Sequence, residues 1–112
     1  AMHAREVWQR DLAKIFLDVD IILSPTLPTL IPPVEEEKSL LEATKDATRN
    51  TYAGAFGKLP GLSIPCGFTS DGLPAGLQLE ASWWDEPLLL KVGAAFQRVT
   101  DWHTYKPKMA KI

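Results

Sequence analysis

Apolar residues recur every three or four positions in three stretches of the chain, and each stretch predicts an amphipathic helix. We expect the first helix over about residues 4–17, the second over about 40–56 and the third over about 86–101. Charged and amide side chains occupy the opposite face of the first helix, so that face is predicted to meet solvent. Each helix therefore needs another layer to cover its apolar side.

The same spacing assigns an inward face to the later helices. Ser39 and Glu42 have the spacing of a capping box at the start of the second helix. Asp85 is a suitable N-cap for the third helix, and Pro87 is tolerated in its first turn. The expected inward residues of the second helix are Leu41, Thr44, Thr48, Thr51, Tyr52 and Ala55. Those of the third helix are Leu88, Leu89, Val92, Ala95, Phe96 and Val99.

Residues 62–80 contain two apolar segments around an Asp-Gly step at 71–72. Asp-Gly between apolar runs is typical of a β-hairpin, because Gly accepts a positive φ and Asp tolerates it. Pro65 cannot donate a ladder hydrogen bond, so it indicates an edge position or a bulge. In the second segment leucines alternate with Gln78 and Glu80, which predicts a strand with one covered face and one polar face.

A short β-branched run at residues 21–23 predicts one further strand. The order is then helix, strand, loop, helix, hairpin, helix, which defines an α/β fold. We expect a small mixed sheet with a β-hairpin, covered by about three helices. Residues 1–112 form a single segment in this interpretation, and so small a sheet favours membership of a larger domain.

Residues 24–38 form a Pro-rich loop followed by an acidic run. Four prolines within residues 25–33 exclude a regular helix or a central strand and favour an extended backbone. Such a loop serves either as a rigid connector or as one wall of a ligand pocket. The Glu-Glu-Glu-Lys run at 35–38 is typical of a solvated loop.

Composition excludes several classes of protein. The net charge of −2 provides no basic field for nucleic acid or for an anionic membrane. No apolar run reaches the roughly 20 residues of a membrane span, and the charged amphipathic start has no signal-peptide core. The single cysteine excludes an intrachain disulfide and a cysteine-cluster metal site. We expect a cytoplasmic protein with neither a nucleic-acid nor a membrane partner.

Few residues offer reactive chemistry. Cys66 lies in an apolar strand, where it is either a structural thiol or a nucleophile. His103 lies near the expected end of the third helix, where capping and catalysis are the alternatives. Because His3 and His103 lack metal-ligand spacing and no nucleotide-binding motif is present, we predict no metal and no cofactor. Trp83 and Trp84 form either a packing or subunit contact or an aromatic ligand face.

Five segments of the chain form a recognisable series. The two most specific are Leu-Pro-Gly-Leu-Ser-Ile-Pro-Cys-Gly-Phe at 59–68 and Asp-Gly-Leu-Pro-Ala-Gly-Leu-Gln-Leu at 71–79. The others are Asp-Ile-Ile-Leu-Ser-Pro-Thr-Leu-Pro at 20–28, Asp-Glu-Pro-Leu-Leu-Leu at 85–90 and Asp-Trp-His at 101–103. Together they resemble the carboxy-terminal part of the amidase signature family.

The resemblance implies a large α/β/α domain that hydrolyses a carboxamide or transfers its nitrogen. The family's catalysts are a Ser nucleophile and a bridging Ser, in a Gly/Ser-rich signature, and an upstream Lys base. These 112 residues contain no such signature, so no catalytic residue is assigned. The resemblance assigns Thr26, Leu27 and Pro28 to a substrate-pocket wall. Ala55 and Lys58 stand where the family usually has Asn and Gly.

Two hypotheses from different classes follow. In the first, the chain is the carboxy-terminal structural portion of an amidase and is inactive alone. Its partner is then the missing amino-terminal part of the domain, and only the complete enzyme hydrolyses a small-molecule amide. In the second, the chain is an independently folded association module that forms homo-oligomers through strand edges and the Trp83-Trp84 pair, without catalysis. Self-association is expected under both hypotheses, because an isolated piece exposes apolar surface that the missing part would cover. A small hydrolase that uses Cys66 is a third alternative.

Overall fold

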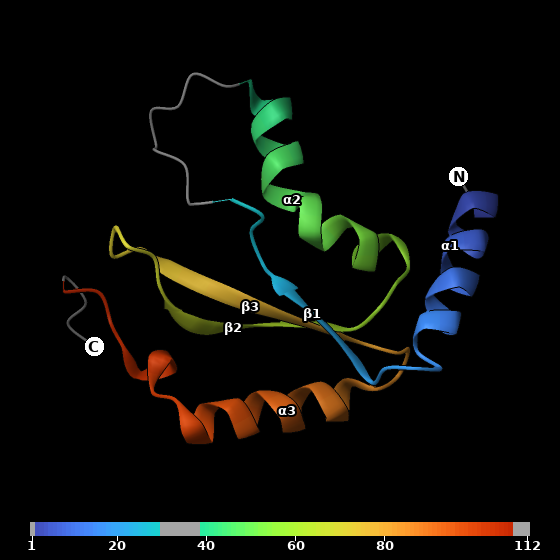
Figure 1. The fold of residues 1–112 in the computed structure, drawn as a ribbon. Coiled ribbons are helices and arrows are strands. Elements are labelled where there is room, and N and C mark those ends of the chain that lie inside the picture. The colour runs from blue at the N-terminus through green and yellow to red at the C-terminus, as the bar shows by residue number, and fades with distance from the viewer. Residues whose placement is uncertain (1, 30–38, 109–112) are drawn as a thin grey trace.

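The structure is a computed structural model that describes residues 2–29 and 39–108 (Figure 1). The three predicted helices, the hairpin and the short strand are all present. The predicted acidic run and the end of the Pro-rich loop lie outside the described residues. The elements are α1 (Met2–Ile15), β1 (Ile21–Pro25), α2 (Leu40–Phe56), β2 (Gly61–Phe68), β3 (Pro74–Ala81), α3 (Glu86–Val99) and a 3-10 turn (Trp102–Thr104).

The three strands form one sheet in the order β1–β3–β2. β2 and β3 make the predicted hairpin, and β1 pairs with the other edge of β3, so Leu23 and Leu62 both lie opposite Leu79. The register shifts between Pro65 and Gly67, as expected for a proline on an edge strand. The α/β class is confirmed. The parallel pairing of a mixed sheet is absent from the described strands, because β3 separates β1 from β2 and runs antiparallel to both.

Helix α3 covers the apolar face of the sheet. Its Leu89 is buried together with Ile64 of β2 and Leu79 of β3. Gly93 lets the helix approach closely, because a Cβ there would lie 2.9 Å from Leu62 Cδ2. Burying one such leucine side chain stabilises the fold by roughly 1.5–3 kcal/mol. These contacts therefore form the main core.

Helix α2 lies on the opposite side of the sheet from α3 (Figure 1). Its predicted cap is confirmed, because Ser39 Oγ accepts a hydrogen bond from the amide N of Glu42 at 3.2 Å. The predicted inward face is wrong in part, since Leu41 and Tyr52 are 65% and 66% exposed. The buried residue of α2 is Gly54. This helix therefore meets the sheet through small and polar groups.

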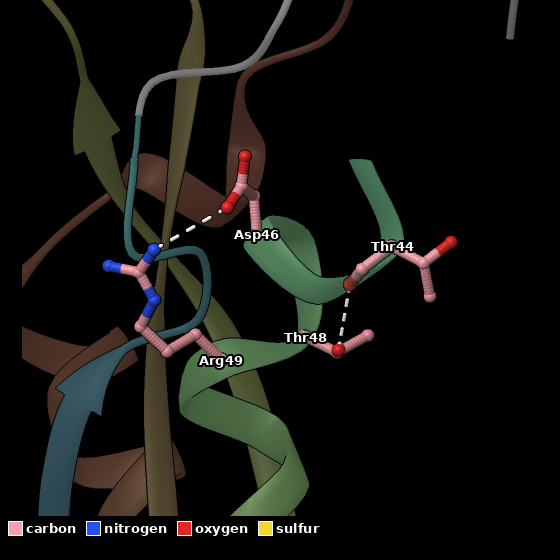
Figure 2. A network of polar contacts seen from close by, with 4 residues as sticks. All are labelled: Thr44, Asp46, Thr48 and Arg49. Carbon is pink, nitrogen blue, oxygen red and sulfur yellow. Dashed lines mark hydrogen bonds and ion pairs between the residues drawn. The ribbon is translucent and has the colours of Figure 1, made fainter. Parts of the chain in front are cut away.

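Threonine hydroxyls in the first half of α2 bond to carbonyls of the same helix, and Figure 2 shows the bond from Thr48. Thr48 Oγ1 donates to the carbonyl O of Thr44 at 2.7 Å. On the same helix Arg49 forms an exposed ion pair with Asp46, with 3.5 Å between Nη2 and Oδ1. An exposed pair at this spacing contributes only about 0.3–0.5 kcal/mol, so these groups support the helix locally.

Helix α1 is fastened to the carboxyl end of α2 by side-chain hydrogen bonds. The last carbonyls of a helix lack donors within it, and here side chains bond to Ala53 O and Phe56 O. Ala53 O also accepts from the amide N of the cap residue Gly57 at 3.2 Å. The cation of Arg5 also lies 5.2 Å from the centre of the Phe56 ring and near the negative end of the helix. The α1 bonds run from Arg5 Nε to Phe56 O (3.1 Å), Trp8 Nε1 to Ala53 O (2.8 Å) and Gln9 Nε2 to Gly57 O (3.1 Å). Trp83, which lies between β3 and α3, donates to the same Gly57 O at 2.8 Å.

Candidate functional site

The three residues predicted to form a pocket wall follow directly after β1. Leu27 and Pro28 line a cavity of about 420 Å³, which Thr69 and Pro74 at the hairpin end also line. Thr26 lines a different cavity, of about 300 Å³, between α2 and the sheet. The structure thus divides the predicted residues between two hollows. Their contact with a substrate stays a prediction.

A hydroxyl bridge crosses the central strand of the sheet. The Thr26 amide N donates to the carbonyl O of Gly76 on β3, at 3.0 Å, while Ser63 belongs to β2 on the other edge. The side-chain oxygens of Thr26 and Ser63 are 2.6 Å apart and form a hydrogen bond. A Cβ at position 76 would lie 2.8 Å from Thr26 Oγ1 and 3.1 Å from Ser63 Oγ. Glycine in the central strand therefore makes room for the bridge.

Two residues further along β3, Gln78 is buried although its side chain is polar. Its Nε2 donates to the carbonyl O of Asn50 at 2.9 Å and to Glu80 Oε1 at 3.2 Å. Asn50 in turn donates from Nδ2 to the carbonyl O of Pro25 at 2.9 Å. Because buried polar groups are costly unless they are hydrogen-bonded, this network holds α2, β1 and β3 together.

The next residue on this face, Glu80, is half-buried against α2. A Cβ at Gly54 would overlap its carboxylate, so the glycine allows the acid to approach the helix backbone. Desolvation by burial raises the pKa of Glu80, and the hydrogen bond from Gln78 opposes this by favouring the ionised form. The carboxylate is therefore under-stabilised when it is charged.

These groups surround the 300 Å³ hollow, which we call the α2 cavity. Its lining includes Thr26, Thr51, Ser63, Gln78 and Glu80 together with the apolar residues Ala55 and Leu59. Alternation along β3 predicted that Gln78 and Glu80 share one face, but it did not predict that Ser63 lies beside them. The register of the hairpin could have predicted this contact, because it places Ser63 opposite Gln78.

The other candidate residues are not assembled into a reactive centre. Cys66 is partly buried, and its Sγ lies 3.6 Å from the carbonyl O of Ala75 as a weak donor. His3 and His103 are both exposed, on α1 and on the 3-10 turn beyond α3. The Cys66 thiol therefore has a hydrogen-bond partner on the backbone, which fits a structural role. Among the described residues no base is bonded to this thiol, as a nucleophile would need.

The two adjacent tryptophans have different environments. Trp83 donates its indole N–H to Gly57 O and meets the ring of Phe16 edge-on, with 6.4 Å between centroids. Trp84 is 90% exposed and adopts φ 68°, a conformation that bulky residues rarely adopt. Packing therefore accounts for Trp83 but not for Trp84.

Two negative findings concern only the described ranges. Within residues 2–29 and 39–108, no three His, Cys, Asp or Glu side chains are grouped closely enough to hold a metal ion. No helix in these ranges has both the length and the apolar character that crossing a bilayer requires.

Comparison with known proteins identifies the class. The family model described as Amidase matches residues 1–90. A glutamyl-tRNA(Gln) amidotransferase subunit of Chloroflexus aggregans is 41% identical over 111 residues, which cover 99% of this chain and 22% of that protein. The corresponding subunit of Cupriavidus necator is 36% identical over 110 residues, which cover 98% of this chain and 22% of that protein.

Solved structures agree with this class. A 6-aminohexanoate cyclic dimer hydrolase shares the fold with a TM-score of 0.83 at 22% identity, over 93% of this chain and 24% of that one. The S177A allophanate hydrolase of Kluyveromyces lactis has a TM-score of 0.77 at 28% identity, over 88% of this chain and 16% of that one. The fold and the matches define a segment of the amidase class.

This chain belongs to the amidase family. It spans about 22% of the length of the curated relatives that it matches. The suspected resemblance to the amidase signature family is thereby confirmed.

Proposed function

We propose that this chain is the carboxy-terminal structural portion of an amidase whose complete form hydrolyses carboxamide C–N bonds. The observation that carries the proposal is a family match over residues 1–90 in a chain that spans only 22% of its relatives. The partner is then the remaining, amino-terminal part of the amidase domain. The substrate of the complete enzyme is a small-molecule amide.

The same proposal gives the chain no hydrolytic activity of its own. The family resemblance assigns catalysis to two serines and a lysine in and upstream of a Gly/Ser-rich signature, and no such stretch occurs in these 112 residues. The role of the chain is to supply a sheet, its covering helices and a pocket wall. Thr26, Leu27 and Pro28 are the proposed wall residues, in keeping with their positions beside two cavities.

A complementation assay tests this function. The chain is mixed with an amidase relative that lacks the matching carboxy-terminal segment, and ammonia release from a carboxamide is measured. We expect no hydrolysis by either component alone and measurable hydrolysis by the mixture. A Leu79→Asp variant, which places a charge in the core, should not complement. Turnover by the chain alone, lost on Cys66→Ala, would overturn the proposal in favour of the third hypothesis.

A second candidate function is that of an association module that forms homodimers without catalysis. The exposure of Trp84 favours it, since large aromatic side chains are enriched at the centres of protein interfaces. Light scattering after size exclusion tests this association. Dimers that become monomers on Trp84→Ala would support association, whereas a monomer at every concentration would remove it.

We further propose that the protein acts in the cytoplasm, without a nucleic-acid or membrane partner. The single cysteine and the net charge of −2 support this location and this lack of charged partners. Fractionation of cells that express the native protein would test it. Recovery with membranes or with nucleic acid would contradict it.

A further inference from the structure

The α2 cavity contains one ionisable side chain among its described lining residues, the Glu80 carboxylate. No Lys, Arg or His belongs to that described lining. The elements packed around this acid present Thr51 and Gly54 from α2, and Gly61 and Ser63 from β2. None of these side chains carries charge, so the cavity has a local negative charge without a cationic partner in its lining.

The other polar groups of the cavity present mainly hydrogen-bond acceptors. Both hydrogens of the Gln78 amide are committed, one to Asn50 O and one to Glu80 Oε1. Thr51 Oγ1 donates its hydrogen to Thr48 O at 3.1 Å and keeps its lone pairs. The Thr26–Ser63 bond uses one of the two hydroxyl hydrogens, so the pair keeps one hydrogen and lone pairs on both oxygens. A ligand that brings donors and positive charge complements this set.

We infer that the α2 cavity binds a small primary amine as its ammonium cation, with the Glu80 carboxylate as counter-ion and the Thr26 and Ser63 hydroxyls as acceptors. An ammonium group has three donors and no acceptor, which matches a carboxylate and two hydroxyl oxygens. Ala55 and Leu59 offer apolar contact to a short alkyl tail. A volume of about 300 Å³ lies at the small end of ligand pockets, which restricts the amine to a few carbons.

The ionisation of Glu80 is consistent with such a ligand. Burial raises the pKa of this acid because its charged form is desolvated. A cation within hydrogen-bond distance favours the charged form, so amine binding should lower the pKa of Glu80. Binding of this kind needs no catalytic group and therefore stands whether or not the chain works within an amidase.

The test uses the 112-residue chain with n-butylamine as the probe and butan-1-ol as the neutral control. Amide ¹H–¹⁵N spectra report the site, and the ¹³C resonance of the Glu80 carboxyl is followed against pH. Glu80→Gln removes the charge but keeps an acceptor for Gln78. Glu86→Gln is the matched control, because Glu86 is an exposed acid on α3.

We expect butylamine, but not butanol, to shift the amides of Gly61, Ser63 and Glu80 to saturation. Glu80→Gln should weaken binding at least about tenfold, as for loss of one charge-assisted hydrogen bond, and Glu86→Gln should not. In the unsubstituted chain butylamine should lower the pKa of Glu80, so the inference stays testable even if Glu80→Gln unfolds. Equal responses to amine and alcohol, or a Glu80 pKa that butylamine leaves unchanged, would overturn it.

Discussion

Replacing Gly76 with alanine tests whether the hydroxyl bridge between Thr26 and Ser63 requires a residue without a side chain at position 76. The new methyl group would lie 2.8 Å from Thr26 Oγ1 and 3.1 Å from Ser63 Oγ. Both distances are shorter than ordinary contact, and threonine is stiff about χ1, so the bridge must open. Gly76 is not among the glycines with positive φ, so the backbone itself accepts alanine.

Three effects set the size of the change. Overpacking costs typically about 1–3 kcal/mol, and loss of one hydrogen bond costs about 0.5–1.5 kcal/mol. Alanine also lowers the conformational entropy of the unfolded chain, which offsets about 0.4–1 kcal/mol of this loss. We therefore expect Gly76→Ala to lower the free energy of unfolding by about 1–3 kcal/mol.

Urea denaturation followed by tryptophan fluorescence measures this loss. Gly61→Ala is the matched control, because a Cβ at this position of β2 would meet only Leu79 O at 3.8 Å and Glu80 Cγ at 4.0 Å. In a Ser63→Ala background the bridge is already broken, so Gly76→Ala should cost about 1 kcal/mol less. Stability equal to or above that of the unsubstituted chain, or strictly additive effects of the two substitutions, would refute the reasoning.

The remaining predictions concern four other positions. Burial raises the pKa of Glu80 in the folded chain above its value in the unfolded chain. The contribution of Glu80 to the free energy of unfolding is therefore largest below the pKa of the unfolded chain, and it is lost as pH rises through the pKa of the folded chain. Glu80→Gln should therefore stabilise the chain at neutral pH but not at low pH in urea titrations, and Glu86→Gln should show no such trend. Leu79→Ala, at the most buried large side chain, should cost about 2–5 kcal/mol by the same assay. Trp8→Phe removes a donor to α2 and should cost about 0.5–1.5 kcal/mol, whereas Trp84→Phe should stay within about 0.5 kcal/mol.

Each of these has a contrary result. A Glu80→Gln difference that is constant with pH would show that the acid titrates alike in the folded and unfolded chain. A Leu79→Ala loss below about 1 kcal/mol would mean that the core relaxes around the cavity. Equal effects of Trp8→Phe and Trp84→Phe on stability would show that the hydrogen bond from the Trp8 indole to Ala53 O does not stabilise the fold.

Local patterns predicted the elements of the fold well, because they depend on neighbouring residues. The Asp-Gly step placed the hairpin, and Pro65 marked the strand with the register shift. The Ser39 cap was also visible from spacing alone. Asp85 shows the limit: it stands at the N-cap of α3, yet its side chain makes no cap hydrogen bond.

The surroundings of the elements could not be predicted from the same patterns. Alternation along β3 predicted a polar face bearing Gln78 and Glu80, but not that α2 covers it. A helix above polar groups does not need an apolar stripe, so Leu41 and Tyr52 remain exposed while Gly54 is buried. The candidate site depends on contacts between strands and a helix that are distant in sequence, such as Thr26 with Ser63.

The attachment of α1 to α2 limits how the amino-terminal helix can change in length. Arg5, Trp8 and Gln9 lie at spacings of three and four, so their donors point from one side of a single turn. Inserting or deleting one residue between Arg5 and Gln9 would swing one donor by about 100° around the helix axis. Additions ahead of Arg5 leave the geometry intact. Insertions and deletions should therefore be tolerated before this turn and rejected within it.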